Sequence, residues 1–186
     1  MAEPLKRLFT RDEYYAMAEA GILKPEDRVE LIEGEIYRMS PIGDRHAFCV
    51  TLLSDAFSVL SAQGRVSLSS QNPVHLSDFS EPQPDLAILH RRRAGGDSGH
   101  PTPSMVYLLI EVADTSLEND QRSKMPLYAR CGIPEAWLVD LTRNVLEVYR
   151  DPSREGYRSI QRLRRGDRIA PLAFPDFEIA VETILP

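Results

Sequence analysis

The chain has 186 residues, of which 42% are hydrophobic and 27% charged, so it can bury the core of one globular domain. Its net charge of −6 argues against a protein whose whole surface binds nucleic acid through basic residues. No apolar run reaches the roughly 18 residues of a membrane span, and the N-terminal residues do not resemble a signal peptide. Its two cysteines, Cys49 and Cys131, are too few for a disulfide framework or a four-thiolate zinc site. We therefore expect a cytoplasmic protein with reduced thiols and no membrane contact.

The N-terminal part predicts a helix followed by a hairpin. Thr10 and Glu13 form the pattern of a capping box, and Gly21 is a suitable residue to end the helix. Two β-rich runs in RVELIEGEIYRM (residues 28–39) flank Glu33-Gly34, which predicts a β-hairpin.

The middle of the chain predicts an amphipathic helix and several strands. The helix spans about His46 to Ala62 and ends at Gly64, because its apolar residues recur at helical spacing. Short strands are expected in RVSLSS (65–70) and PVHL (73–76), followed by a strand in EPQPDLAILH (81–90).

The second half predicts the centre of the sheet. The apolar run MVYLLIEVA (105–113) is typical of a strand buried on both faces, and EAWLVDL (135–141) is a second one. A helix from about Leu117 to Cys131 lies between them, and Pro126 either begins or kinks part of it. Strand, helix and strand in this order predict a parallel crossover.

Antiparallel edges complete the predicted fold. NVLEVYR (144–150) and GYRSIQRL (156–163) are expected to form a meander, and the last twenty residues to lie over the body of the domain. The fold class is therefore α/β: residues 1–186 form a single domain with a mixed β-sheet core flanked by helices, preceded by an N-terminal helix and hairpin.

Two acids at core strands are the main candidates for chemistry. Glu111 interrupts the apolar run of residues 105–113, and Asp85 follows Pro84 at the start of LAIL. Burying an ionised carboxylate is costly unless a cation or a metal compensates it. Either acid alone is equally well explained by a loop cap or an arginine partner. Together, on neighbouring strands, they predict a site for a hard cation such as Mg²⁺.

The segments RVELIEGEI, EPQPDLAIL and LLIEVADTSLENDQRSKMPLYARCGIPEAWLVDL, spread over residues 28–141, resemble the PD-(D/E)XK nuclease superfamily. More closely, they resemble the Uma-type family of restriction-endonuclease-like proteins. The resemblance implies a Mg²⁺- or Mn²⁺-dependent endonuclease that hydrolyses phosphodiester bonds of nucleic acid, with DNA as the expected partner. It implies that Asp85 and Glu111 bind the metal, together with the backbone carbonyl of Val112.

The chain departs from the superfamily pattern at one position. Ala113 stands two residues after Glu111, where the superfamily has a lysine. Residues 111 and 113 of a strand share a face, so alanine leaves room beside Glu111. The resemblance implies that Lys124, on the following helix, fills this space and orients or activates the attacking water. The alternative is that Lys124 forms an exposed ion pair with Asp120.

Other residues are weaker candidates, each with an alternative. Glu30 is favoured over Glu33 as a third acid, although either residue also fits a solvent-facing strand. His46 either faces the phosphate or caps the helix, and Gln71 either binds substrate or holds a turn. Glu81 is expected to be a loop charge.

Two other functions stay open. One is a catalytically inert module that binds nucleic acid or has a structural role, which the negative charge and Ala113 favour. The other is a metal hydrolase that acts on a small phosphorylated molecule, because a fold alone does not fix the substrate. A homodimer is expected for an enzyme that cuts both strands of a duplex.

Overall fold

A six-stranded sheet forms the centre of the molecule, in a computed structural model that describes residues 5–24, 26–92, 98–114 and 116–186. In spatial order its strands are β3 (Val66–Ser69), β4 (Leu86–His90), β5 (Val106–Ala113), β6 (Glu135–Asp140), β7 (Val145–Ser153) and β8 (Gly156–Leu163). β5 and β6 are parallel and the other neighbouring pairs are antiparallel. The mixed α/β class, the parallel crossover and the meander are therefore confirmed.

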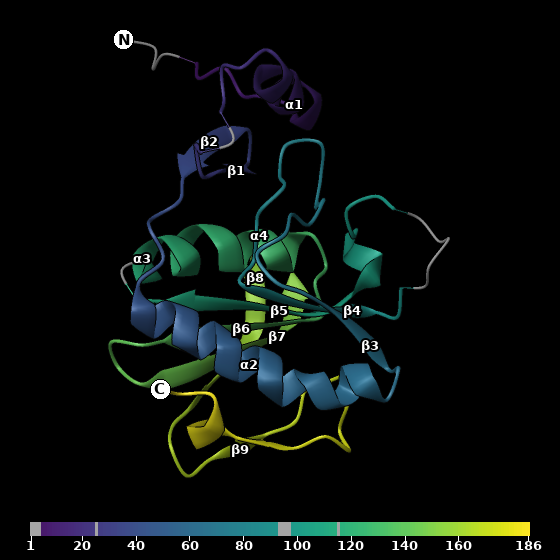
Figure 1. Cartoon of the computed structure of the whole chain (residues 1–186), viewed down its shortest axis with the longest axis vertical. Helices are drawn as coiled ribbons and strands as arrows, with labels where there is room; N and C mark the ends of the chain where they lie inside the picture. The colour runs from purple at the N-terminus through teal and green to yellow at the C-terminus, as the bar shows by residue number, and fades with distance from the viewer. Residues whose placement is uncertain (1–4, 25, 93–97, 115) are drawn as a thin grey trace.

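Helices cover both faces of the sheet (Figure 1). The long helix α2 (Asp44–Ala62) lies on one face, and the helical segment that ends in α4 (Met125–Arg130) lies on the other. Alternate residues of β5 serve the two layers: Ile110 and Val112 belong to the core beneath α2, whereas Leu109 and Ala113 belong to the core beneath α4. Both faces of β5 are buried, as its continuous apolar run predicts.

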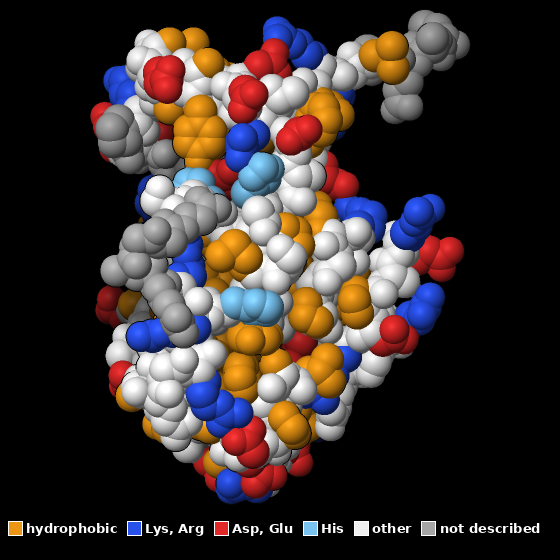
Figure 2. Space-filling view, turned by 90° about the vertical axis from the view of Figure 1, so that its right-hand side faces the viewer, with side chains coloured by type: hydrophobic (Ala, Val, Ile, Leu, Met, Phe, Trp, Pro, Cys, Tyr) orange, Lys and Arg blue, Asp and Glu red, His pale blue; other side chains and the backbone are white. Residues whose placement is uncertain are grey.

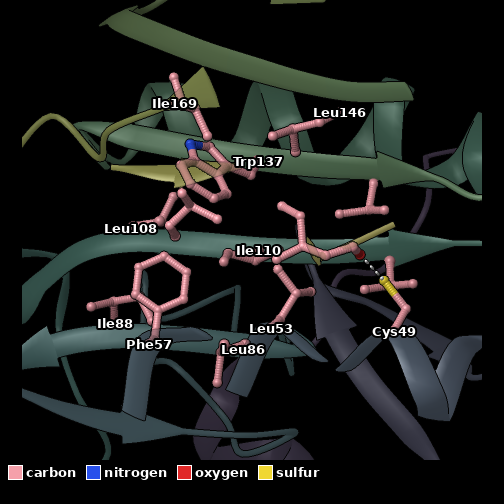
Figure 3. Packing of buried hydrophobic residues seen from close by; sticks show 14 of the residues in the cluster. Cys49, Leu53, Phe57, Leu86, Ile88, Leu108, Ile110, Trp137, Leu146 and Ile169 are labelled. Carbon is pink, nitrogen blue, oxygen red and sulfur yellow. Dashed lines mark hydrogen bonds between the residues drawn. The ribbon is translucent and has the colours of Figure 1, made fainter. Parts of the chain in front are cut away.

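The core beneath α2 is built from aromatic and aliphatic side chains (Figure 3). Phe57 of α2 packs on Trp137 of β6, with ring centroids 5.8 Å apart. The Cys49 thiol lies in the same layer and donates a 3.3 Å hydrogen bond to the Ile184 carbonyl. The C-terminal segment closes this side through the short elements β9 (Arg168–Ile169), β10 (Ile179–Ala180) and η3 (Val181–Thr183). The predicted position of the tail over the body is confirmed.

The N-terminal helix α1 (Arg11–Glu19) and the hairpin of β1 (Val29–Ile32) and β2 (Glu35–Arg38) lie beyond the α4 layer (Figure 1). The Thr10–Glu13 capping box is present. Glu33 and Gly34 both have positive φ, as the turn of a two-residue hairpin requires. A Cβ at Gly34 would lie 2.5 Å from Leu8 Cβ, so only glycine fits there.

One predicted strand is absent, and the predicted helix is divided near Pro126. Residues 73–76 form no strand; the Val74 amide instead bonds the Pro82 carbonyl, in a stretch whose prolines cannot donate to a β-ladder. The single helix expected over Leu117–Cys131 is three pieces: α3 (Leu117–Asn119), the π-helical turn η2 (Asp120–Lys124) and α4. Pro126 is the second residue of α4, where its missing N–H is tolerated.

One further short helix, η1 (Pro103–Met105), precedes β5. In the described part of the chain, no helix has the length and apolar character needed to cross a bilayer.

Candidate active site

Asp85 and Glu111 come from adjacent central strands. The register pairs Leu86 with Ile110, so Asp85, the next residue out, lies opposite Glu111 where β4 begins. Asp85 Oδ2 accepts a 2.8 Å hydrogen bond from the Val112 amide, and both acidic residues are buried. The register thus brings the two sequence-predicted acids to the same end of the sheet.

Two of the weaker candidates contact Asp85 directly. His46 Nε2, near the start of α2, lies 3.0 Å from Asp85 Oδ2, and the Gln71 amide donates to Oδ1 at 3.3 Å. The hydrogen bond to Asp85 raises the pKa of His46, although burial opposes the shift. Gln71 also holds the turn before β4, with φ of 52° and a backbone N–H to the Pro84 carbonyl. His46 and Gln71 therefore fix the position of the Asp85 carboxylate.

Lys124 lies between two buried carboxylates. Its Nζ is 3.1 Å from Glu30 Oε2 and 3.3 Å from Glu111 Oε2, and its side chain is 5% exposed. Lys124 is thus not the surface residue of an exposed ion pair, because η2 turns it toward the strands. Burial lowers the pKa of Lys124, but the surrounding carboxylates raise it more, so the net shift is upward. The ammonium is therefore charged at neutral pH.

Glu30 joins the cluster from the hairpin. Its Oε2 also accepts a 3.1 Å hydrogen bond from the backbone N–H of Gln83, which ties β1 to the chain that leads into β4. The alternative that Glu30 is a solvent-facing strand residue is wrong, because Glu30 is only 4% exposed. Glu33, the other candidate acid, lies outside the cluster and pairs with Arg130 at 2.6 Å.

The carboxyl group of Glu111 is held by two donors from the helical segment. Besides Lys124, the Tyr128 hydroxyl donates a short hydrogen bond to its Oε1. Burial raises the pKa of Glu111 well above 4.5, and Lys124 counteracts this shift only in part. A proton or a bound cation would therefore stabilise Glu111 in this position.

Sequence reasoning did not identify Asp120 and Tyr128. Asp120 is 3% exposed and accepts a 2.6 Å hydrogen bond from Ser116; burial raises its pKa. It is close enough to Lys124, Asp85 and Glu30 to affect their charge balance. Residues 120, 124 and 128 are four apart, and this spacing, applied to a buried rather than an exposed helix face, would have identified them.

The oxygen donors suit a hard cation. Mg²⁺ takes one or two carboxylates, keeps several waters and is satisfied by the ligand chemistry of Asp85, Glu111 and a backbone carbonyl. Among the residues that the structure describes, no three His, Cys, Asp or Glu side chains form a ready-made metal cage. A site of two carboxylates completed by water does not require such a cage.

The side of the molecule drawn in Figure 2 shows no large basic patch among the residues drawn in colour. Figure 2 shows the side of the molecule with β3 and β4, where basic and acidic side chains are interspersed over the part of the chain drawn in colour. A polyanion that approached this face would meet single basic side chains rather than a continuous basic surface.

A mixed sheet between helical layers, with two acids from adjacent strands beside a lysine, is the arrangement of a restriction-endonuclease-like protein. A crystal structure described as a putative nuclease belonging to DUF820, from Anabaena variabilis ATCC 29413, has this fold with a TM-score of 0.71. The two chains are 16% identical over 95% of this chain and 97% of that one. Residues 11–182 match the Uma2 family, described as "Putative restriction endonuclease", and the chain belongs to that family. No curated protein matched the sequence.

Proposed function

We propose that this protein is a Mg²⁺- or Mn²⁺-dependent endonuclease that hydrolyses phosphodiester bonds of DNA. The observation that carries the proposal is the Lys124 ammonium, buried between Glu111 and Glu30 at the strand ends where Asp85 also lies. A structural core has no need of this costly arrangement, whereas a phosphate-cleaving site uses each of its parts. The family description and the fold of the structural neighbour support the same activity.

In this proposal Asp85, Glu111 and the Val112 carbonyl hold the cation. When bound there, the cation would supply Lewis-acid chemistry, namely polarisation of the scissile phosphate and a lower pKa for a bound water. His46 and Gln71 keep the Asp85 carboxylate oriented toward the site, and Tyr128 does the same for Glu111. These contacts supply the second layer of support that metal ligands require.

Lys124 acts through its charge in this scheme. Because its pKa is raised, the ammonium orients water and neutralises charge that develops on the phosphate, rather than removing a proton as a base. Glu30 holds the ammonium in place from the opposite side. Lys124 thus supplies from the helical segment the positive charge that Ala113 cannot supply from the strand.

DNA is proposed because the family is described as restriction endonucleases, and a homodimer would place one site on each strand of a duplex. A net charge of −6 means that binding depends on the metal and on local arginines. The alternative, a catalytically inert module, would bind nucleic acid or serve a structural role without cleaving DNA.

A cleavage assay distinguishes the proposed endonuclease from the inert module. Wild type, Asp85→Asn and the exposed control Asp55→Asn are incubated with supercoiled plasmid and single-stranded DNA, with Mg²⁺, Mn²⁺ or EDTA. We expect metal-dependent cleavage by wild type and Asp55→Asn, and none by Asp85→Asn, because the amide replaces a charged metal ligand. Binding without cleavage by all three proteins would favour the inert module. Activity that persists in Asp85→Asn would show that another site cleaves the DNA.

A further inference from the structure

Exposed arginines gather around the turn between β6 and β7 (residues 141–144). Arg143 lies in this turn, and its side chain is 66% exposed. Arg45, at the start of α2, donates a 2.8 Å hydrogen bond to Asn144 Oδ1 of the same turn. The exposed Arg164 follows β8, whose last residue pairs with the second residue of β7. Three segments that are far apart in the sequence thus bring positive charge to one place.

This turn borders the catalytic cluster. The residue before it pairs with Ala113 at the end of β5, two residues beyond Glu111. The turn therefore begins about 5 Å, one strand spacing, from the end of β5. Arg45 directly precedes His46, whose Nε2 contacts Asp85. The starts of α2 and α3 lie at this end of the sheet (Figure 1), so the arginines and the two acids share it.

Carboxylates leave much of this positive charge uncompensated. Elsewhere several surface arginines bind acids closely, as Arg65 does with Asp176 at 2.7 Å. Arg45 instead bonds a neutral side-chain amide, and Arg143 lies 3.7 Å from Asp140, whose Oδ1 already accepts from backbone N–H groups of the turn. Residues 44–45, 142–144 and 164–168 contain five arginines and two acids, a surplus of three positive charges in a chain of net charge −6. This end of the molecule is therefore suited to bind an anion.

We propose that Arg45, Arg143 and Arg164 bind backbone phosphates of the DNA strand on one side of the scissile bond. The inference rests on the proposed nuclease function and names the surface that holds the substrate. Guanidinium groups bind phosphate through paired, charge-assisted hydrogen bonds. Each guanidinium has five N–H donors, so Arg45 keeps donors for a phosphate while one of them binds the turn.

Such contacts position the substrate without reading its sequence. Phosphate contacts fix the register of a protein on DNA but carry no base information. The three arginines would therefore align the scissile phosphate with Asp85 and Glu111 on DNA of any sequence. Each phosphate that an arginine neutralises releases counterions, so its contribution appears in the salt dependence of binding.

The salt dependence of DNA binding tests the proposal. Two labelled duplexes of unrelated sequence are titrated by fluorescence anisotropy, with Ca²⁺ in place of Mg²⁺, between about 50 and 200 mM KCl. Arg45→Gln, Arg143→Gln and Arg164→Gln should each make the slope of log K against log salt shallower by about 0.9, and should weaken the binding of both duplexes alike. Arg154→Gln is the matched control, because Arg154 is an exposed residue in the turn between β7 and β8, at the opposite end of the sheet. It should keep the wild-type slope.

All of the replaced side chains are exposed, so the variants should melt with wild type. Wild-type slopes in the three variants, an equal loss in Arg154→Gln, or an effect on only one duplex overturns this inference. Cleavage of DNA by the wild type would leave the nuclease proposal standing in each of these cases. A wild type that neither binds nor cleaves DNA overturns both.

Discussion

Replacing Lys124 with methionine tests the cluster most severely, because the change removes the charge and keeps the length of the side chain. The ammonium lies 3.1 Å from Glu30 and 3.3 Å from Glu111, in a side chain that is 5% exposed. Removing one partner of a buried ion pair costs about 3–5 kcal/mol, because the remaining charge stays buried without compensation. Two carboxylates lose their cation here, so we expect a loss in the upper part of this range.

The loss converts into a large shift of the melting temperature. For a chain of 186 residues, each kcal/mol lowers Tm by about 2–4 °C, so a loss of about 4–5 kcal/mol should make Lys124→Met melt roughly 8–20 °C below wild type at neutral pH. Removal of the lysine raises the pKa of the Glu111 carboxyl in the folded state more than it does in the unfolded state. Protonation then stabilises the folded variant, so the loss should be smaller at pH 5 than at pH 8.

Differential scanning calorimetry at the two pH values measures this effect, with Lys6→Met as the control. Lys6 makes an exposed ion pair with Glu35, so its replacement should leave the unfolding free energy close to that of wild type. In the cleavage assay Lys124→Met should lower kcat by about 10²–10³-fold, the value of one lost transition-state donor. A variant that melts with wild type at both pH values, or that cleaves at the wild-type rate, would refute the reasoning.

Three further predictions concern Glu111 and its donors. Glu111→Gln should abolish cleavage and leave the fold intact, and Mg²⁺ should raise the Tm of wild type but not of this variant. Tyr128→Phe should cost about 1–2 kcal/mol in urea unfolding, because it removes a buried hydrogen bond, and should reduce kcat less than Lys124→Met does. The pKa of Glu111 is raised above 4.5 in the folded state, so protonation of Glu111 stabilises the fold of the metal-free wild type. This stabilisation is complete below pH 4.5 and is lost as the pH rises through the folded-state pKa. Calorimetry from pH 4.5 upward should show this loss in wild type and not in Glu111→Gln; parallel curves would contradict it.

The strands were predictable because their periodicity is strong, whereas the segment before α4 was not. An apolar run that contains only Glu111 as a charged residue fits a strand buried on both faces, and the structure confirms it. Pro126 predicts a new helix start or a kink within residues 117–131, because proline lacks an N–H and its ring crowds the carbonyl four residues earlier. The structure has a helix start at this point, but the π-helical turn before it was not predicted. The widened turn η2 accommodates the proline, and it also turns Asp120 and Lys124 inward. π-Helical turns of this kind often occur at functional sites.

The candidate site was predictable only as far as its residues stand in a linear motif. The motif contains Asp85, Glu111 and Lys124, and the structure brings them to one end of the sheet. The four-residue spacing of Lys124 and Tyr128 indicates that they share a helix face, but the burial of Glu81 depends on how the hairpin packs, which no local pattern records. The role of Tyr128 in catalysis stays a prediction.

The central claim is that Asp85 and Glu111 bind one catalytic cation. The most direct measurement is an anomalous difference map from crystals of the wild-type protein grown with Mn²⁺. We predict a peak in contact with both carboxylates, and no such peak in crystals of Asp85→Asn grown in the same way. Manganese bound elsewhere with this pair left without a peak, or an equal peak at this position in Asp85→Asn, would contradict the account.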